Sequence, residues 1–247
     1  MTDRLDRVLV ERGLARSRNQ AQAAVRNGQV LVNGRVAARP SQAVGADDQV
    51  TTSGDQPYVS RAALKLAGAL AASGMPVPAR VLDAGASTGG FTQVLLAAGA
   101  DRVYAVDVGH DQLAPELRAD PRVVVHERTN LRELGLQHLE QEPVGLVVAD
   151  VSFISLRLLL PRLLAVLAPG GSALVLVKPQ FEVGRPGLDD SGVVRDPGLR
   201  ASAVAGVVAA AADLGWSAAW QAESGLPGES GNVEYFVHLV RSGDPPH

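Results

Sequence analysis

Short runs of β-branched and apolar residues, each ending in polar residues, recur along the chain after residue 57. They are RVLDAG (80–85), RVYAVDVG (102–109), RVVVHER (122–128), VGLVVAD (144–150), SALVLVK (172–178) and GNVEYFVHLV (231–240). Helical stretches separate most of them. This alternation predicts an α/β domain with a mostly parallel sheet. In open sheets of this kind, ligands bind beyond the carboxyl ends of the strands.

The first fifty residues show a different pattern, with two short helices. Apolar residues at helical spacing between Leu5 and Leu9 predict a first helix, which Gly13 ends. Ser17 is a candidate N-cap for a second helix over residues 18–26.

The second helix has one polar face, and a hairpin is expected after it. Arg18, Gln22 and Arg26 are spaced four residues apart and share that face. Alternating apolar residues then surround Asn33-Gly34, which is a strong signal for two strands joined by a tight turn.

Positive charge is concentrated in this N-terminal head. Residues 1–50 hold eight Arg and five acidic residues, a net charge of +3, whereas the remainder of the chain has a net charge of −6. A basic head on an acidic body indicates contact with a polyanion, and a solvated Arg-rich face is an equally good explanation from charge alone. Residues 40–57 are rich in Gly, Pro, Ser and Asp, so we expect domains at 1–57 and 58–247.

Composition excludes several classes of protein. The 247-residue chain has 46% hydrophobic and 20% charged residues and no Cys, so we expect neither disulfides nor a thiolate metal site. The charged N-terminus argues against a signal peptide, and the apolar run over 201–216 is too short to span a bilayer. A cytoplasmic protein without a membrane partner is therefore expected.

The stretch LDAGASTGGFTQVLL (82–96) predicts a strand, a glycine-rich turn and a helix. Gly85, Gly89 and Gly90 follow GxxxGG, so the dinucleotide fingerprint GxGxxG is imperfect. Asp107 ends the next strand, where a carboxylate can grip the ribose hydroxyls of either NAD or S-adenosylmethionine. The five His residues share no strand-end position, which disfavours hydride transfer. Tight packing of the strand on the helix is the alternative explanation of the glycines.

Lysine is rare in this chain, which has 21 Arg but only Lys65 and Lys178. Lysine can lose its proton in a protein and arginine cannot, so the two lysines indicate sites that need a titratable or compact amine. Two leftover surface lysines are the alternative. Lys178 and Asp150 end neighbouring strands, whereas Lys65 lies early in a helix that Ser60 is expected to cap. Glu234 begins the last strand, and an antiparallel strand there would bring all four charged residues to one edge.

Two parts of the chain resemble known families. Lys65, Asp150, Lys178 and Glu234 resemble the Lys-Asp-Lys-Glu tetrad of RNA ribose 2'-O-methyltransferases of the FtsJ type. The first fifty residues resemble the small RNA-binding domain first described in a ribosomal small-subunit protein. With YVSRAALKL, LDAGASTGGFT, VVADVSFISL, LVKPQFEVG and SGNVEYF, nearly the whole chain is similar to the TlyA-type rRNA methyltransferases of the haemolysin A family.

The resemblance implies a fold and a reaction. The fold would be α/β, a Rossmann-like class I methyltransferase with a seven-stranded, mostly parallel sheet, preceded by a small α+β RNA-binding domain. The reaction would be methylation of a ribose 2'-hydroxyl in ribosomal RNA or ribosomal subunits. The activity of the family implies that the methylated nucleotide is a cytidine. S-adenosyl-L-methionine would be the cofactor and no metal would be needed.

The resemblance also implies roles for residues of this chain. Lys178 would be the base, Asp150 and Lys65 would orient the hydroxyl and the amine, and Glu234 would hold a lysine from behind. The residues expected to bind the cofactor are Asp83, Gly85, Ser87, Gly89, Asp107 and Asn130. Those expected to bind RNA are Arg16, Arg18, Gln22, Arg26 and Arg35.

Three rival functions are less compatible with the sequence. A non-catalytic RNA-binding assembly factor is disfavoured by the intact tetrad. A pore-forming haemolysin is disfavoured because the sequence offers no membrane-spanning helix and no long amphipathic hairpin. A small-molecule methyltransferase is disfavoured by the RNA-binding head.

Side chains near the motifs have two possible roles each. Core packing is expected for Phe153, Phe181 and Tyr235, with stacking on an extruded base as the alternative. Arg185 and Arg195 either contact phosphates or belong to an ordinary solvated loop. Trp216 and Trp220 are expected in the core or in an edge strand.

Overall fold

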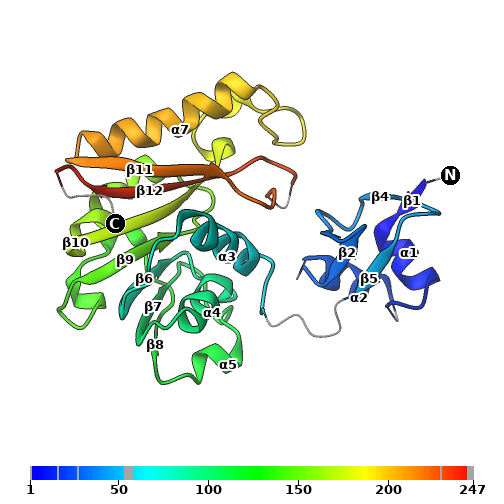
Figure 1. The fold of residues 1–247 in the computed structure, drawn as a ribbon, viewed down its shortest axis with the longest axis horizontal. Coiled ribbons are helices and arrows are strands. Elements are labelled where there is room, and N and C mark those ends of the chain that lie inside the picture. The colour runs from blue at the N-terminus through cyan, green and yellow to red at the C-terminus, as the bar shows by residue number, and fades with distance from the viewer. Residues whose placement is uncertain (1, 16, 27, 53–57, 229, 244–247) are drawn as a thin grey trace.

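The computed structural model describes residues 2–15, 17–26, 28–52, 58–228 and 230–243. They form two parts that lie side by side, an N-terminal module (2–52) and a larger C-terminal module (58–243) (Figure 1). The boundary expected at residue 57 lies outside the described residues.

The N-terminal module contains the two predicted helices and the predicted hairpin. Its elements are β1 (Thr2–Arg4), α1 (Leu5–Glu11), α2 (Arg18–Arg26), β2 (Val30–Val32), β3 (Arg35–Val36), β4 (Ala43–Gly45) and β5 (Val50–Thr52). β1 pairs with β4, and β2 lies between β3 and β5 in a three-stranded sheet. The Ser17 Oγ accepts a hydrogen bond from the Gln20 amide at 3.2 Å, which confirms the predicted cap. Asn33 and Gly34 both have positive φ, as a tight hairpin turn requires.

A seven-stranded sheet in the order β11-β12-β10-β9-β6-β7-β8 organises the C-terminal module. Its strands are β6 (Arg80–Ala84), β7 (Arg102–Val106), β8 (Val123–His126), β9 (Val144–Ala149), β10 (Leu167–Val177), β11 (Trp216–Glu223) and β12 (Tyr235–Arg241). The first five of these run parallel, whereas β12 is antiparallel to β10 and β11 is antiparallel to β12. The predicted seven-stranded, mostly parallel sheet is confirmed, and both tryptophans lie in its edge strand β11.

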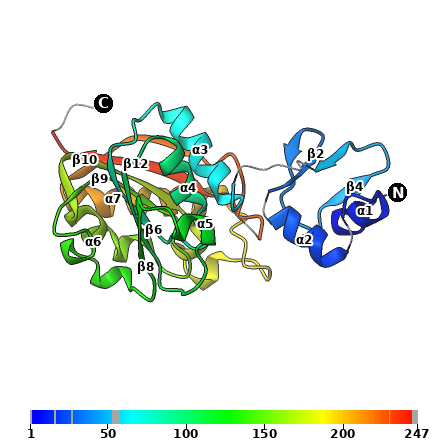
Figure 2. The same ribbon diagram turned by 90° about the horizontal axis from the view of Figure 1, so that it is seen from below.

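Helices cover both faces of this sheet (Figure 2). The α-helices of this module are α3 (Ala62–Ser73), α4 (Gly90–Ala97), α5 (Pro115–Arg118), α6 (Leu160–Ala165) and α7 (Pro197–Ala212). Five short 3-10 helices are η1 (Leu131–Glu133), η2 (Leu136–His138), η3 (Leu156–Leu158), η4 (Pro179–Phe181) and η5 (Arg185–Gly187). Alternate residues of the central strands pack against α3, α4 and α5 on one face and against α6 and α7 on the other. Burial on both faces explains why these strands are apolar runs rather than alternating sequences.

The predicted cap of α3 is wrong. The helix begins after Arg61, whose side chain makes no capping bond, and in the described part of the chain the buried Ser60 Oγ has no hydrogen-bond partner. Ser60 lies instead against Gly90 at the start of α4, where a Cβ would collide with its hydroxyl oxygen. Close packing between α3 and α4 therefore takes the serine away from the helix amides.

No helix in the described part of the chain is both long enough and apolar enough to cross a membrane.

Candidate active site

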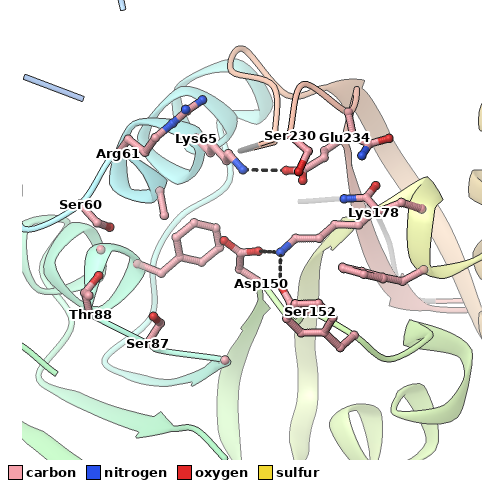
Figure 3. A pocket seen from close by; sticks show the side chains of 18 of the residues that line it. Ser60, Arg61, Lys65, Ser87, Thr88, Asp150, Ser152, Lys178, Ser230 and Glu234 are labelled. Atoms are coloured by element: carbon pink, nitrogen blue, oxygen red, sulfur yellow. Dashed lines mark hydrogen bonds and ion pairs between the residues drawn. The ribbon is translucent and has the colours of Figure 1, made fainter. Parts of the chain in front are cut away.

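The four charged residues of the predicted tetrad line one cavity of about 610 Å³ and form two ion pairs (Figure 3). The Lys65 Nζ lies 2.6 Å from Glu234 Oε2. The Lys178 Nζ lies 2.7 Å from Asp150 Oδ1. The structure thus gives each lysine its own carboxylate partner.

The order of the strands explains why these residues meet. Asp150 follows β9 and Lys178 follows β10, and these two strands are parallel neighbours. β12 runs the other way, with Tyr235 opposite Val177, so Glu234 lies level with the end of β10. The first turn of α3 carries Lys65 over the same edge (Figure 3).

The two pairs differ in burial. Side-chain exposure is 8% for Lys65 and 3% for Glu234, compared with 11% for Lys178 and 14% for Asp150. The Lys178 Nζ also donates a hydrogen bond to the Ser152 Oγ at 2.8 Å. Burying a charge costs free energy unless a partner compensates it, so both amines are held where their carboxylates lie.

Two residues of this neighbourhood were not predicted from the sequence. Ser152 lies two positions after Asp150, and nothing in its local pattern distinguishes it from a turn residue. Arg61 is buried, and its guanidinium donates to the Ala38 carbonyl at 2.5 Å and to the Pro227 carbonyl at 2.7 Å. Arg61 therefore ties the N-terminal module to the loop that precedes Glu234. The one sequence feature that could have drawn attention to Arg61 is its position as a charged residue directly before an apolar helix.

The glycine-rich turn borders the same cavity, which Gly85, Ser87 and Gly90 help to line. Gly85 has a φ of 88°, and a Cβ there would lie 2.6 Å from the Asp150 carbonyl oxygen. Both the backbone conformation and the close approach of the next strand require glycine at this position. Gly89 also has a positive φ, at the start of α4.

Asp107 fixes this turn against the end of β7. Its Oδ2 accepts from the Ser87 amide at 2.9 Å, and its Oδ1 accepts from the Gly109 amide at 2.7 Å. An ionised carboxylate has about four acceptor positions, so these two bonds leave capacity for further donors.

Asp83 lies beneath the turn and is fully buried. The Thr92 Oγ1 donates to its Oδ2 at 2.7 Å, while its Oδ1 has no hydrogen-bond partner among the described residues. Burial raises the pKa of Asp83 to about 7, and the nearby Asp150 charge adds to the effect. Asp83 is placed to shape the turn from inside.

Asn130 does not reach the cavity. Its Oδ1 accepts from the Arg132 amide at 3.0 Å and caps η1, and its side chain is exposed. Its role in binding a cofactor stays a prediction.

The aromatic residues near the site differ in exposure and packing. Core packing is wrong for Phe153, whose side chain is 92% exposed and whose φ is 65°. Its ring lies 5.4 Å from that of Phe181, and both rings line the cavity. Tyr235 packs against the core, as expected.

The residues predicted to bind RNA do not form a single face. Arg18 and Gln22 both donate to the buried Asp6 of α1, at 3.1 and 2.9 Å. Hydrogen bonds from Arg4, Gln22 and Arg18 hold the pKa of the Asp6 carboxyl well below its usual range. This aspartate, which the sequence analysis missed, joins the two helices.

The other predicted RNA-binding arginines point to different places. Arg26 is exposed and lines the cavity of the tetrad, so the N-terminal module reaches this site. Arg35 lines a second hollow between the modules. Arg16 lies outside the described residues.

No group of three or more His, Cys, Asp or Glu side chains within the described ranges is arranged to hold a metal ion.

Comparison with known proteins assigns the class. The model of the FtsJ-like methyltransferase family matches residues 58–241, and the model of the S4 domain matches residues 3–50. The chain belongs to the FtsJ-like methyltransferases.

Within that class, the chain belongs to the TlyA family. It is 51% identical over 239 residues to the 16S/23S rRNA (cytidine-2'-O)-methyltransferase TlyA of Mycobacterium tuberculosis, covering 96% of this chain and 89% of that protein. It is 42% identical to the Bacillus subtilis protein YqxC, covering 98% and 87%. A solved structure from Streptococcus thermophilus that carries a hemolysin name is 38% identical, with a TM-score of 0.76 and coverage of 99% and 90%.

Proposed function

We propose that this protein transfers a methyl group from S-adenosyl-L-methionine to the ribose 2'-hydroxyl of a cytidine in ribosomal RNA, in the cytoplasm. The observation that carries the proposal is the meeting of two lysine–carboxylate pairs in one cavity beside the glycine-rich turn. The name of the mycobacterial relative supports the choice of cytidine and of ribosomal RNA.

The residues at the turn fit such a cofactor. A side chain at position 85 or 89 would distort the glycine-rich turn, and the glycines at both positions avoid this. Asp107 has acceptor capacity left for ribose hydroxyls at the end of β7. When bound, the cofactor supplies a methyl group on a positively charged sulfonium.

Lys178 is the proposed base. Its Nζ would take the proton of the 2'-hydroxyl, and for this it must be present as the neutral amine, a state that arginine does not reach. Asp150 and Ser152 hold the Nζ from two sides, at 2.7 and 2.8 Å, and so fix its direction. Such positioning is worth a large share of the rate in a transfer between two bound groups.

Lys65 has a different proposed task. Because Glu234 holds its Nζ in the more buried pair, Lys65 keeps a fixed charge over the cavity and orients the hydroxyl oxygen. Glu234 also links α3 to the start of β12 through this pair (Figure 3).

Phe153 offers a face for the target base. A ribose within a folded RNA is hard to reach unless its nucleotide turns out of the stack, and an exposed ring beside the cavity can receive the base. The positive φ of Phe153 holds an apolar side chain in water, a conformation that favours a binding role over a packing role.

The test is transfer of labelled methyl from S-adenosylmethionine to unmodified small and large ribosomal subunits. Label recovered in alkali-resistant dinucleotides would place it on ribose, and free nucleosides serve as the control substrate. Tight binding to subunits without transfer to either of them would overturn the proposal and favour an assembly factor.

A further inference from the structure

A second hollow, of about 820 Å³, lies where the two modules meet. We call it the junction hollow. The charged side chains that line it are Arg35, Arg39, Arg195 and Asp48. The first two arginines and Asp48 come from the N-terminal module, and Arg195 comes from the loop before α7. With three cations and one anion, the hollow has a net charge of +2, although the chain as a whole has a net charge of −3.

The single carboxylate is already satisfied within its own module. Asp48 accepts from the Asn33 side-chain amide and from the Gly45 backbone amide, each at 2.8 Å. The hydrogen bond from Asn33, with the one from Gly45, lowers the pKa of Asp48, so its charge is dispersed among local donors. No ion pair to a carboxylate is found for Arg35 or Arg39 in the described part of the chain.

Arg195 is held in place with donors to spare, whereas Arg39 approaches the C-terminal module without an ion pair among the described residues. The Arg195 Nε lies 2.7 Å from Asp189 Oδ2, which fixes the stem, and the side chain stays 74% exposed. Asp189 also accepts from the amides of Ser191 and Val193, which build the loop around it. Arg39 reaches across to the C-terminal module, where a Cβ on Gly231 would lie 3.9 Å from its Nη1.

The junction hollow and the catalytic cavity share their walls. In the loop between β11 and β12, Ser230 and Asn232 line the catalytic cavity, whereas Pro227 and Gly231 line the junction hollow. The loop before α7 divides in the same way, with Ser191 and Gly192 on the catalytic side and Arg195 on the other.

Arg61 links the walls of the two hollows. It lines the catalytic cavity and donates to carbonyls of Ala38 and Pro227, both of which line the junction hollow. The two modules are thus joined by a buried guanidinium at the point where the two hollows adjoin.

We propose that the junction hollow binds backbone phosphates of the RNA strand next to the methylated nucleotide, with Arg39 and Arg195 as the main contacts. This rests on the proposed function, because the shared walls matter only if RNA occupies the catalytic cavity. Guanidinium groups match phosphate geometry through paired N–H donors. We favour RNA over an acidic protein because the hollow adjoins the cavity in which the proposed function places a ribose, and Arg26 adds positive charge there.

The proposed site is composite, since neither module holds both main contacts. It selects RNA by the position of phosphates relative to the target ribose and not by base sequence.

The test compares Arg39→Ala, Arg195→Gln and the double variant with wild type in binding to unmodified large ribosomal subunits over a range of salt concentrations. Arg162→Ala, an exposed arginine on α6 without an ion pair among the described residues, is the matched control. The double variant should bind about tenfold more weakly or worse, and its salt slope should fall by about two. The control and the cofactor affinity should not change.

Binding of the double variant within twofold of wild type, with the same salt slope, would overturn the proposal. If the double variant binds polyglutamate more weakly than wild type does but binds subunits equally well, the proposal is overturned in favour of an acidic protein. Methyl transfer by wild type is measured in parallel. If it is absent while the double variant still loses subunit binding, RNA binding by the junction hollow stands, and the proposed enzymatic function and the placement of the hollow beside a methylated nucleotide fail.

Discussion

The two ion pairs of the catalytic cavity share a chemistry and differ in their surroundings. Lys65 and Glu234 are nearly sealed, and their charges connect a helix to the start of an antiparallel strand. Lys178 and Asp150 are more accessible and include a serine hydroxyl as a third partner. This difference in burial underlies the proposal that Lys65 is a fixed charge and that Lys178 is a proton acceptor.

A third carboxylate extends the comparison. Asp83 is buried at least as deeply as Glu234, but among the described residues it accepts hydrogen bonds from Thr92 and has no cation partner. A carboxyl without a cation responds to burial by keeping its proton, which is why the pKa of Asp83 rises to about 7. The three sites thus separate the effect of burial from the effect of a partner.

The largest expected effect follows from removing the accessible amine. Lys178→Ala should lower single-turnover methyl transfer by about a thousandfold or more, because positioned proton transfer contributes on that order. Cofactor and subunit binding, measured by titration, should stay within a few-fold of wild type. Transfer within tenfold of wild type would show that another group accepts the proton.

The buried pair should matter more for folding. Glu234→Ala leaves the Lys65 charge enclosed without a partner and should lower the free energy of unfolding by about 3–5 kcal/mol. Asp150→Ala should lower the free energy of unfolding by less, because Lys178 is closer to solvent. Both variants are measured by urea titration. Equal losses in the two variants would break the distinction between the pairs.

Asp83 should make stability depend on pH. The folded protein holds the carboxyl proton up to a pKa of about 7, whereas the unfolded chain releases it near the ordinary aspartate pKa of 3.8. The contribution is therefore fully present below about pH 4 and is lost as pH rises through 7, by up to about 4 kcal/mol.

Asp83→Asn is the matched variant, since it keeps the shape and removes the titration. Its free energy of unfolding, measured by urea titration from pH 4 to pH 7.5, should fall less with rising pH than that of wild type. Parallel curves for the two proteins would contradict the assignment.

The smallest expected effect lies at the exposed ring. Phe153→Ala should raise the KM for ribosomal subunits by about tenfold, since stacking of one base on an aromatic ring is worth about 1–3 kcal/mol. The midpoint of thermal unfolding should not fall, because the ring is almost fully exposed. A matched truncation at Leu158, another exposed apolar residue, should leave both quantities unchanged.

Much of the fold was predictable because its causes are local. The strands of the C-terminal module are apolar runs long enough to be buried on both faces, and the tight turn at Asn33-Gly34 needs the backbone freedom that those two residues have. The clustering of the four tetrad residues could also be predicted, since parallel strands place their carboxyl ends at one edge of the sheet.

The remaining features depend on contacts between segments far apart in the chain. Ser60 fails to cap α3 because α4 packs against it, and Arg18 and Gln22 turn toward an aspartate twelve or more residues away. Phe153 is exposed and has a left-handed backbone conformation, and no local sequence pattern predicts either feature. The second hollow exists only where the two modules meet, so no single segment encodes it.

The central claim is that Lys178 acts by exchanging a proton, whereas Lys65 acts as a held charge. Its most direct test is single-turnover methyl transfer to unmodified ribosomal subunits by Lys178→Arg, which keeps the positive charge on a long side chain but not the ability to become neutral. The account predicts loss of transfer, by about a thousandfold, with cofactor and subunits still bound. Transfer by this variant at a tenth of the wild-type rate or faster would contradict it.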